Sequence, residues 1–230
     1  MLTVGHGAQT VRPRHIRSLF MRKSILLACL AWFSVLLQLV LSVQLAIANG
    51  KPAVQGLVAY FGFFTVLTNL FVALVLTLPA LAARTPAGRF FARPPVQACA
   101  ATSIVLVGLA YHVLLRHVWD PEGWQWVADV LLHYVMPVLF CLHWLWAGVG
   151  KLGLRWWAPL AASVYPLVYL AYALARGLWV DSYPYPFIDV KVLGYATVLR
   201  NALGLLVGFV LMGYVLRALG QRVERYRNGG

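Results

Sequence analysis

Six long apolar stretches, separated by short polar segments, run along almost the whole chain. They cover approximately residues 24–48, 54–82, 96–115, 124–149, 157–175 and 192–216. A helix needs about 20 mostly apolar residues to cross a hydrocarbon core roughly 30 Å thick, and these stretches match or exceed that length. The pattern predicts an all-α polytopic membrane protein built as a bundle of six transmembrane helices.

The predicted bundle occupies residues 24–216 and leaves two short basic tails, residues 1–23 and 217–230. The first apolar stretch ends in Ala46-Ile47-Ala48, and a basic leader before such a sequence is also typical of a cleaved signal peptide. This stretch, however, is longer than the about 7 to 15 apolar residues of a signal peptide. We therefore expect a membrane-spanning helix there.

Composition excludes a soluble globular domain. Hydrophobic residues make up 62% of the chain and charged residues only 11%, whereas a soluble domain carries roughly a quarter charged residues. The three cysteines, Cys29, Cys99 and Cys141, lie in or beside apolar stretches without a metal-binding spacing. We expect no disulfide framework, no metal site and no cofactor.

The net charge of +13 concerns membrane topology, because most Lys and Arg residues lie between the apolar stretches. We therefore expect no nucleic-acid partner. With both termini in the cytoplasm, fourteen Lys and Arg residues fall on the inner side, against four in the outer segments. The four outer residues are Lys51, Arg116, Arg176 and Lys191. The positive-inside rule therefore predicts cytoplasmic termini.

Polar residues follow one face of the second apolar stretch. Thr65, Thr68 and Asn69 stand at positions i, i+3 and i+4, which places them on one stripe of a helix. Such residues serve as interhelical hydrogen-bonding partners or as part of a functional site, and both interpretations stay open.

The fourth stretch carries a second polar stripe, in which Gln125, Asp129, His133 and Pro137 repeat every four residues. A carboxylate one helical turn from an imidazole can fix its tautomer and stabilise its cation. Counted from the outer ends of their helices, Thr65 and His133 are expected at comparable depths. The two stripes therefore predict a shared site in the outer half of the bundle.

The fifth stretch carries Tyr165, Tyr169, Tyr172 and Arg176 on a single helix face. Arg176 at the outer end is able to bind a carboxylate with two parallel hydrogen bonds, or to extend to the membrane interface. The following segment, residues 179–189, is rich in aromatic residues and proline, so we expect an ordered cap there that includes Tyr185.

Four strings of residues resemble a known family: YFGFFTVLTNL at 60–70, DVLLHYVMP at 129–137, VYPLVYLAYALARG at 164–177 and YPYPFIDV at 183–190. They are similar to the bacterial six-helix membrane proteins of the Pr-six-Pr family. More distantly, they resemble the family of the androgen-induced-gene product and the androgen-dependent regulator of tissue factor pathway inhibitor. The resemblance to the second family implies an intramembrane threonine hydrolase of fatty acid esters of hydroxy fatty acids.

That resemblance implies a role for each matching residue. The family's nucleophilic threonine follows two apolar residues, as Thr65 does here, and its histidine base precedes a proline, as His133 does. Asp129 would orient that base. The polar residue after the threonine is displaced by one position, which leaves Thr68 as an alternative nucleophile.

Five further residues are predicted to bind the substrate. Asn69 or Asn201 would stabilise the oxyanion, Arg176 would hold a carboxylate, and Tyr172 and Tyr185 would line the site. The predicted partners are membrane lipids or an amphiphilic carboxylate, in a bacterial plasma membrane. The oligomeric state stays open.

Two other functions compete with hydrolysis. A non-catalytic protein that binds or carries a lipid or a small molecule would use the same polar stripes to line a pathway. A haem protein would need two axial histidines at matched depth, and His112 with His133 comes nearest to that arrangement.

Overall fold

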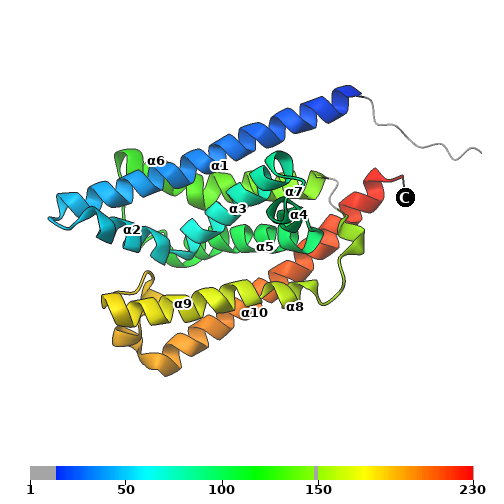
Figure 1. The fold of residues 1–230 in the computed structure, drawn as a ribbon. Coiled ribbons are helices and arrows are strands. Elements are labelled where there is room, and N and C mark those ends of the chain that lie inside the picture. Colours follow the sequence, from blue (N-terminus) through cyan, green and yellow to red (C-terminus); the bar gives the residue numbers. More distant parts are fainter. Residues whose placement is uncertain (1–13, 148–149, 230) are drawn as a thin grey trace, which may run out of the picture.

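The computed structural model describes residues 14–147 and 150–229. Figure 1 shows a bundle of long helices, and the described residues contain no strand. Residues 1–13 of the predicted N-terminal tail and the last two residues of the predicted fourth stretch lie outside the described residues. The rest of that tail, from Arg14, is helical and continuous with the first span, and the C-terminal tail is helical to Arg227.

Six helical segments are long and apolar enough to cross a membrane, which confirms the all-α six-helix bundle. They are Ser24–Ala48, Phe64–Leu81, Pro94–Leu115, Gly123–Trp146, Ala158–Val180 and Val190–Arg227. The elements that compose them are α1 (Arg14–Ala48), α3 (Phe64–Leu81), α5 (Pro94–Ala110), α6 (Gly123–Val130), α7 (Met136–Trp146), α8 (Ala158–Ala162), α9 (Val164–Val180) and α10 (Val190–Arg227). Shorter helices are α2 (Ala53–Gly62) and α4 (Pro86–Phe91).

The helices form a central group with one helix on one side and a helix pair on the other (Figure 1). α1 packs along α2 and α3, and α3, α5 and α7 form the centre of the bundle. Their buried contact surface includes Ala31, Val72, Ile104 and Phe140. α9 and the first half of α10 lie on the far side from α1, where Ala173, Tyr185, Ile188 and Val198 form a separate apolar cluster.

The second span differs from the single helix over 54–82 that its hydropathy predicts. Phe63 is in an extended conformation (φ −88°, ψ 130°) and separates α2 from α3. At the end of α2, the guanidinium group of Arg176 packs directly against Gly62. A Cβ atom at this position would lie 2.9 Å from the guanidinium carbon, so only glycine allows this close approach. α3 therefore begins at Phe64, and Thr65 in its first turn is buried.

Two other spans contain a wide helical turn, the third at its end and the fourth in its interior. The residues Tyr111–Leu115 (η1) and Leu131–Val135 (η2) form π-helical turns, in which an N–H group bonds the carbonyl five residues earlier. Such turns are frequent at functional sites, because they shift the side chains that follow around the helix. Here they carry Tyr111 and His133.

The basic connections gather at one end of the bundle. α4, the end of α7, the start of α8 and the C-terminal end of α10 lie toward the right of Figure 1. Lys151 of the 3₁₀ turn η3 (Lys151–Gly153) is buried there beside Trp144 and near Glu224. The break at Phe63 and the cap segment lie toward the opposite end.

Candidate functional site

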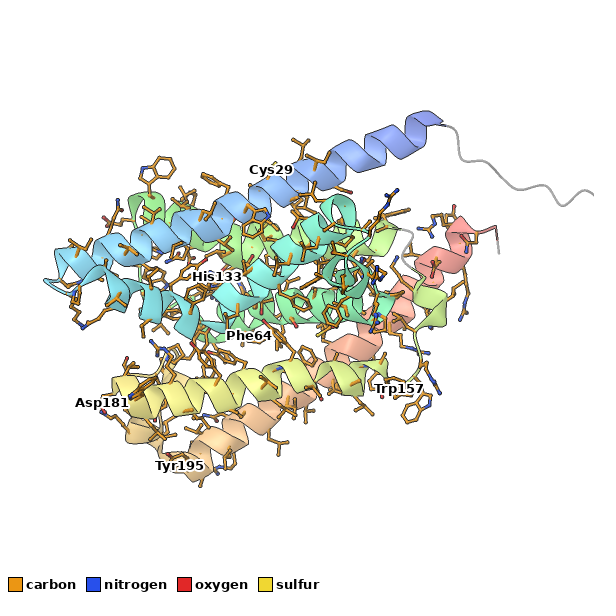
Figure 2. The ribbon with its side chains drawn as sticks, in the orientation of Figure 1. Cys29, Phe64, His133, Trp157, Asp181 and Tyr195 are labelled. Atoms are coloured by element: carbon orange, nitrogen blue, oxygen red, sulfur yellow. The ribbon has the colours of Figure 1, made fainter. Side chains whose placement is uncertain are left out.

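A cavity of about 260 Å³ lies between α1, α3, η1 and the fourth span, beside residues 184–186. It brings together residues that are far apart in the sequence. Its polar lining consists of Gln38, Ser42, Thr65, Tyr111, Gln125, Asp129, His133 and Tyr185. In Figure 2, His133 lies among the helices of the bundle, and Phe64 lies on the side of α3 that faces α9. Thr65, Asp129 and His133 thus line one cavity.

His133 is held by Asp129 and Tyr111. Its Nδ1 lies 3.0 Å from the backbone oxygen of Asp129 and 3.2 Å from the carboxylate Oδ1 of the same residue. The ring of Tyr111 stacks on the imidazole with 3.8 Å between ring centroids, and its hydroxyl donates to Asp129 Oδ2 at 2.6 Å. Asp129 is buried, and its Oδ2 accepts the bond from Tyr111, while its Oδ1 faces Nδ1 of His133 without a hydrogen bond of its own in the part of the chain that the structure describes.

The contacts of Nδ1 determine the tautomer of His133. A carbonyl oxygen only accepts hydrogen bonds, so the bond to the Asp129 backbone requires the hydrogen on Nδ1. In the neutral ring, Nε2 then carries the lone pair and can accept a proton. His133 is therefore arranged as a base, with Asp129 oriented to stabilise the cation that protonation would form.

Thr65 lies in the first turn of α3, where backbone N–H groups have no helical partner. Its N–H donates to the hydroxyl oxygen of Tyr185 at 3.2 Å, and its Oγ1 lies 3.3 Å from the same oxygen. Thr65 and His133 line one cavity, and within it Oγ1 of Thr65 lies at hydrogen-bonding distance from the hydroxyl of Tyr185.

Tyr185 projects from the cap segment into the interior. Its ring stacks on Phe187 with 5.1 Å between centroids and meets the ring of Phe63 edge-on. Burial raises the pKa of Tyr185, although hydrogen bonds to Thr65 act in the opposite direction. Its hydroxyl is therefore neutral at pH 7 and lies where an electron-rich oxygen is favoured by the start of a helix.

Tyrosines of α9 donate hydrogen bonds to the last carbonyl groups of α2. Tyr169 donates to the carbonyl of Gly62 at 3.0 Å, and Tyr172 donates to that of Phe61 at 3.2 Å. Arg176 donates to the carbonyl of Val58 through Nε and Nη2, and to that of Ser182 through Nη1. The edge of Arg176 that was expected to bind a carboxylate is thus engaged with the backbone. Tyr172 and Arg176 stabilise the broken helix in this structure.

Both asparagines of the predicted site also bond the backbone. Asn69 Nδ2 donates to the carbonyls of Thr65 and Leu132, which uses both of its hydrogens. Asn201 donates to the carbonyl of Phe187 and so ties α10 to the cap segment. In this structure both amides are therefore engaged with backbone carbonyls, and the stabilisation of an oxyanion by either one stays a prediction.

Thr68 occupies a different environment from Thr65. It is fully buried, it bonds the hydroxyl of Tyr165 at 3.2 Å, and it is not among the residues that line the cavity. Access to the cavity therefore favours Thr65 over Thr68.

Sequence reasoning did not identify Tyr111 as part of the site. Tyr111 stands at the end of an apolar stretch, without a polar neighbour one turn before it. The one available signal was the need of a buried Asp129 for a hydrogen-bond donor from another helix.

Comparison of the chain with protein-family models, with curated proteins and with solved structures finds no match. Among the described residues, no group of three His, Cys, Asp or Glu side chains is arranged to hold a metal ion.

Proposed function

We propose that this protein is an intramembrane hydrolase of lipid esters, with Thr65 as nucleophile, His133 as base and Asp129 as the group that orients the base. The observation that carries the proposal is the shared cavity, in which a threonine at a helix start faces the same space as a paired histidine. The resemblance to intramembrane threonine hydrolases supports the same assignment.

The proposed reaction has two steps. In the first, Nε2 of His133 takes the proton of Thr65, whose Oγ1 bonds to the acyl carbon, and the ester's alkoxide leaves with that proton. In the second, His133 takes a proton from water, the hydroxide attacks the acyl-threonine, and the Thr65 oxygen leaves and regains a proton. The products are a carboxylic acid and an alcohol.

The oxyanion of each step would be stabilised by the start of α3. The backbone N–H of Thr65 is an available donor once the hydroxyl of Tyr185 moves aside, and a nucleophile's own N–H serves this purpose in serine proteases. The helix start adds a favourable electrostatic field for a negative charge. Both effects would stabilise a negative charge that develops on the carbonyl oxygen beside Thr65.

The proposed setting is a bacterial plasma membrane, which follows from the family resemblance. The proposed partners are membrane lipids or an amphiphilic ester, and nothing in the chemistry of the cavity lining requires a cofactor.

Covalent labelling with a fluorophosphonate probe tests the proposal. The wild-type protein in detergent should be labelled, and Thr65→Ala and His133→Ala should lose labelling at equal protein levels. Thr68→Ala should keep most of it. Thr77→Ala is the matched control, because Thr77 lies on α3 and bonds only its own helix, at the carbonyl of Ala73.

Two outcomes would contradict the proposal. Labelling that depends on Thr68 and not on Thr65 would move the nucleophile by one helical turn. Labelling or ester turnover that persists unchanged in Thr65→Ala and His133→Ala would exclude these two residues as the catalytic pair, and a wild-type protein that shows neither would favour the non-catalytic, lipid-binding function instead.

A further inference from the structure

The cavity at His133 extends to the loop that joins the third and fourth spans. Val118 and Trp119 of that loop are exposed and line the cavity. Asp129, which is buried, and His133, which is partly buried, line the same cavity. The loop lies at the end of the bundle opposite the basic connections (Figure 1). The cavity therefore connects the base with an exposed loop at that end.

A row of uncharged polar side chains lines the cavity between α1 and α6. Gln125, in the first turn of α6, donates to Oε1 of Gln38 at 3.0 Å, and Gln38 donates to the hydroxyl of Ser42 at 3.2 Å. All three residues are partly exposed. In the part of the chain that the structure describes, the carbonyl oxygen and the second amide hydrogen of Gln125 remain available to water.

The size and the lining of this cavity suit water. A volume of about 260 Å³ has room for several water molecules, and the amides and the hydroxyl supply the polar partners that each molecule needs. Gln38 and Ser42 lie within an apolar span, where a polar side chain is costly unless it is hydrogen-bonded. Their presence on the cavity wall indicates a hydrated space rather than a lipid contact.

The proposed hydrolysis consumes one water molecule for each ester. In its second step the water oxygen bonds to the acyl carbon on Thr65, and His133 takes the proton of that water. The bond from the acyl carbon to the Thr65 oxygen breaks, and this oxygen receives the proton from His133. The hydrocarbon around the spans offers no water, so the molecule must arrive through the protein.

We propose that Gln38, Ser42 and Gln125 line a water path from the aqueous phase at this end of the bundle to His133. The two glutamines are positioning residues for the hydrolytic water. The purpose of the path rests on the proposed hydrolase function, whereas the hydration of the cavity is testable without it.

Cysteine accessibility tests the path independently of ester hydrolysis. In a variant whose three native cysteines are replaced, Gln38→Cys and Ser42→Cys should react with a membrane-impermeant methanethiosulfonate from the same side as Ser182→Cys. A thiol reacts as its thiolate, which forms in water. Val40→Cys is the matched control, because Val40 lies between the two on α1 and is 52% exposed on the apolar surface of the span. Its thiol should react at least tenfold more slowly.

Pre-steady-state kinetics with p-nitrophenyl acetate tests the role in the reaction. Gln38→Leu and Gln125→Leu should keep the burst of p-nitrophenol, which reports acylation of Thr65, within twofold of wild type. The later steady rate, which reports hydrolysis of the acyl-threonine, should fall at least tenfold, because water loses hydrogen-bonding partners on the path. Gln125→Asn should retain most of that rate, which separates polarity from folding. Gln97→Leu, in the first turn of α5 at the opposite end, is the matched control.

The outcomes separate the water path from the proposed function. If Gln38→Cys and Ser42→Cys are unreactive, or Val40→Cys reacts as fast as they do, the path is absent whatever the ester activity. If Gln38→Leu and Gln125→Leu hydrolyse the acyl-threonine at the wild-type rate, the glutamines do not position the water. If no burst depends on Thr65, the hydrolase proposal is wrong, while reactive thiols would still establish the hydrated path.

Discussion

Asp129 holds His133 through two of its own atoms, the carboxylate Oδ1 and the backbone oxygen. The backbone contact survives any change of the side chain. In serine proteases, loss of the orienting carboxylate lowers kcat by about 10⁴-fold, because the histidine adopts the wrong tautomer. Here the carbonyl still requires the hydrogen on Nδ1, so the carboxylate is needed mainly for its charge.

Asp129→Asn is therefore expected to lower kcat by about 10- to 100-fold, which is less than the loss for His133→Ala. KM should change little, because the carboxylate lies behind the base. Steady-state turnover of a long-chain ester measures both quantities. Tyr111→Phe is the matched control: it keeps the ring stacked on His133 and removes one hydrogen bond to Asp129, so its effect should be smaller. An Asp129→Asn protein with wild-type kcat would exclude the orienting role.

Lys151 gives the stability of the protein a pH dependence of its own. Burial lowers the pKa of this amine from 10.5 to about 8, while the charge of Glu224 acts in the opposite direction. Between these two pH values the unfolded chain holds a proton that the folded protein has released. Stability should therefore rise with pH across this window, from about 8 to 10.5.

The measurement for Lys151 is thermal unfolding in detergent at pH 7, 8, 9 and 10. Lys151→Met should flatten the rise, because the group that titrates is gone. Lys51→Met, at an exposed position, should retain the wild-type slope. If stability rises equally with pH in all three proteins, Lys151 is not the group that causes the rise.

At the scale of helices, the sequence predicts the spans well and the interruption within one of them poorly. Hydropathy and length identify all six membrane-crossing segments, because each must be apolar over a membrane's width. The break at Phe63 depends on side chains of α9, which lie more than a hundred residues later in the chain. A local pattern contains no information about such partners.

The candidate site shows the same division. Stripes at helical spacing identify Thr65, Asp129 and His133, since those residues need only a regular helix to share a face. The engagement of Tyr172 and Arg176 with the carbonyls of α2 follows from the break, and that of Asn69 with the carbonyl of Leu132 follows from the packing of α3 against the fourth span. Neither contact can be read from a local pattern.

Gly62→Ala tests the close approach on which the break depends. A Cβ atom there would lie 2.9 Å from the guanidinium carbon of Arg176, so the side chain must move off the carbonyl of Val58. We expect a loss of about 1 to 2 kcal/mol in unfolding free energy and a fall in ester turnover. Thermal unfolding and turnover in detergent measure both effects.

Gly204→Ala is the control for Gly62→Ala, because a Cβ atom at Gly204 meets nothing within 4 Å. It should leave stability unchanged or raise it slightly, as alanine favours a helix more than glycine does. If the two variants behave alike, the contact between Gly62 and Arg176 is not what stabilises the break.

For the molecule as a whole, the gathering of basic connections at one end makes a prediction about orientation. The positive-inside rule places that end, and both termini, in the cytoplasm. The site at Thr65 would then lie in the outer half of the membrane.

Labelling of introduced cysteines in intact cells checks this orientation. In a variant whose three native cysteines are replaced, Ser182→Cys should react with a membrane-impermeant maleimide. Arg89→Cys and Arg225→Cys should react only after the cells are lysed. The reverse pattern would invert the orientation.

The broken second span has a consequence for biosynthesis. If the break were present while the chain is being made, the carbonyls of Phe61 and Gly62 would have no donors until the fifth span is inserted, and lipid offers none. We expect the nascent second span to enter the membrane as one uninterrupted helix and to break only when Tyr169, Tyr172 and Arg176 arrive. Thr65 would reach its final position late, so ribosome-bound chains that lack the fifth span should be inert toward an esterase probe.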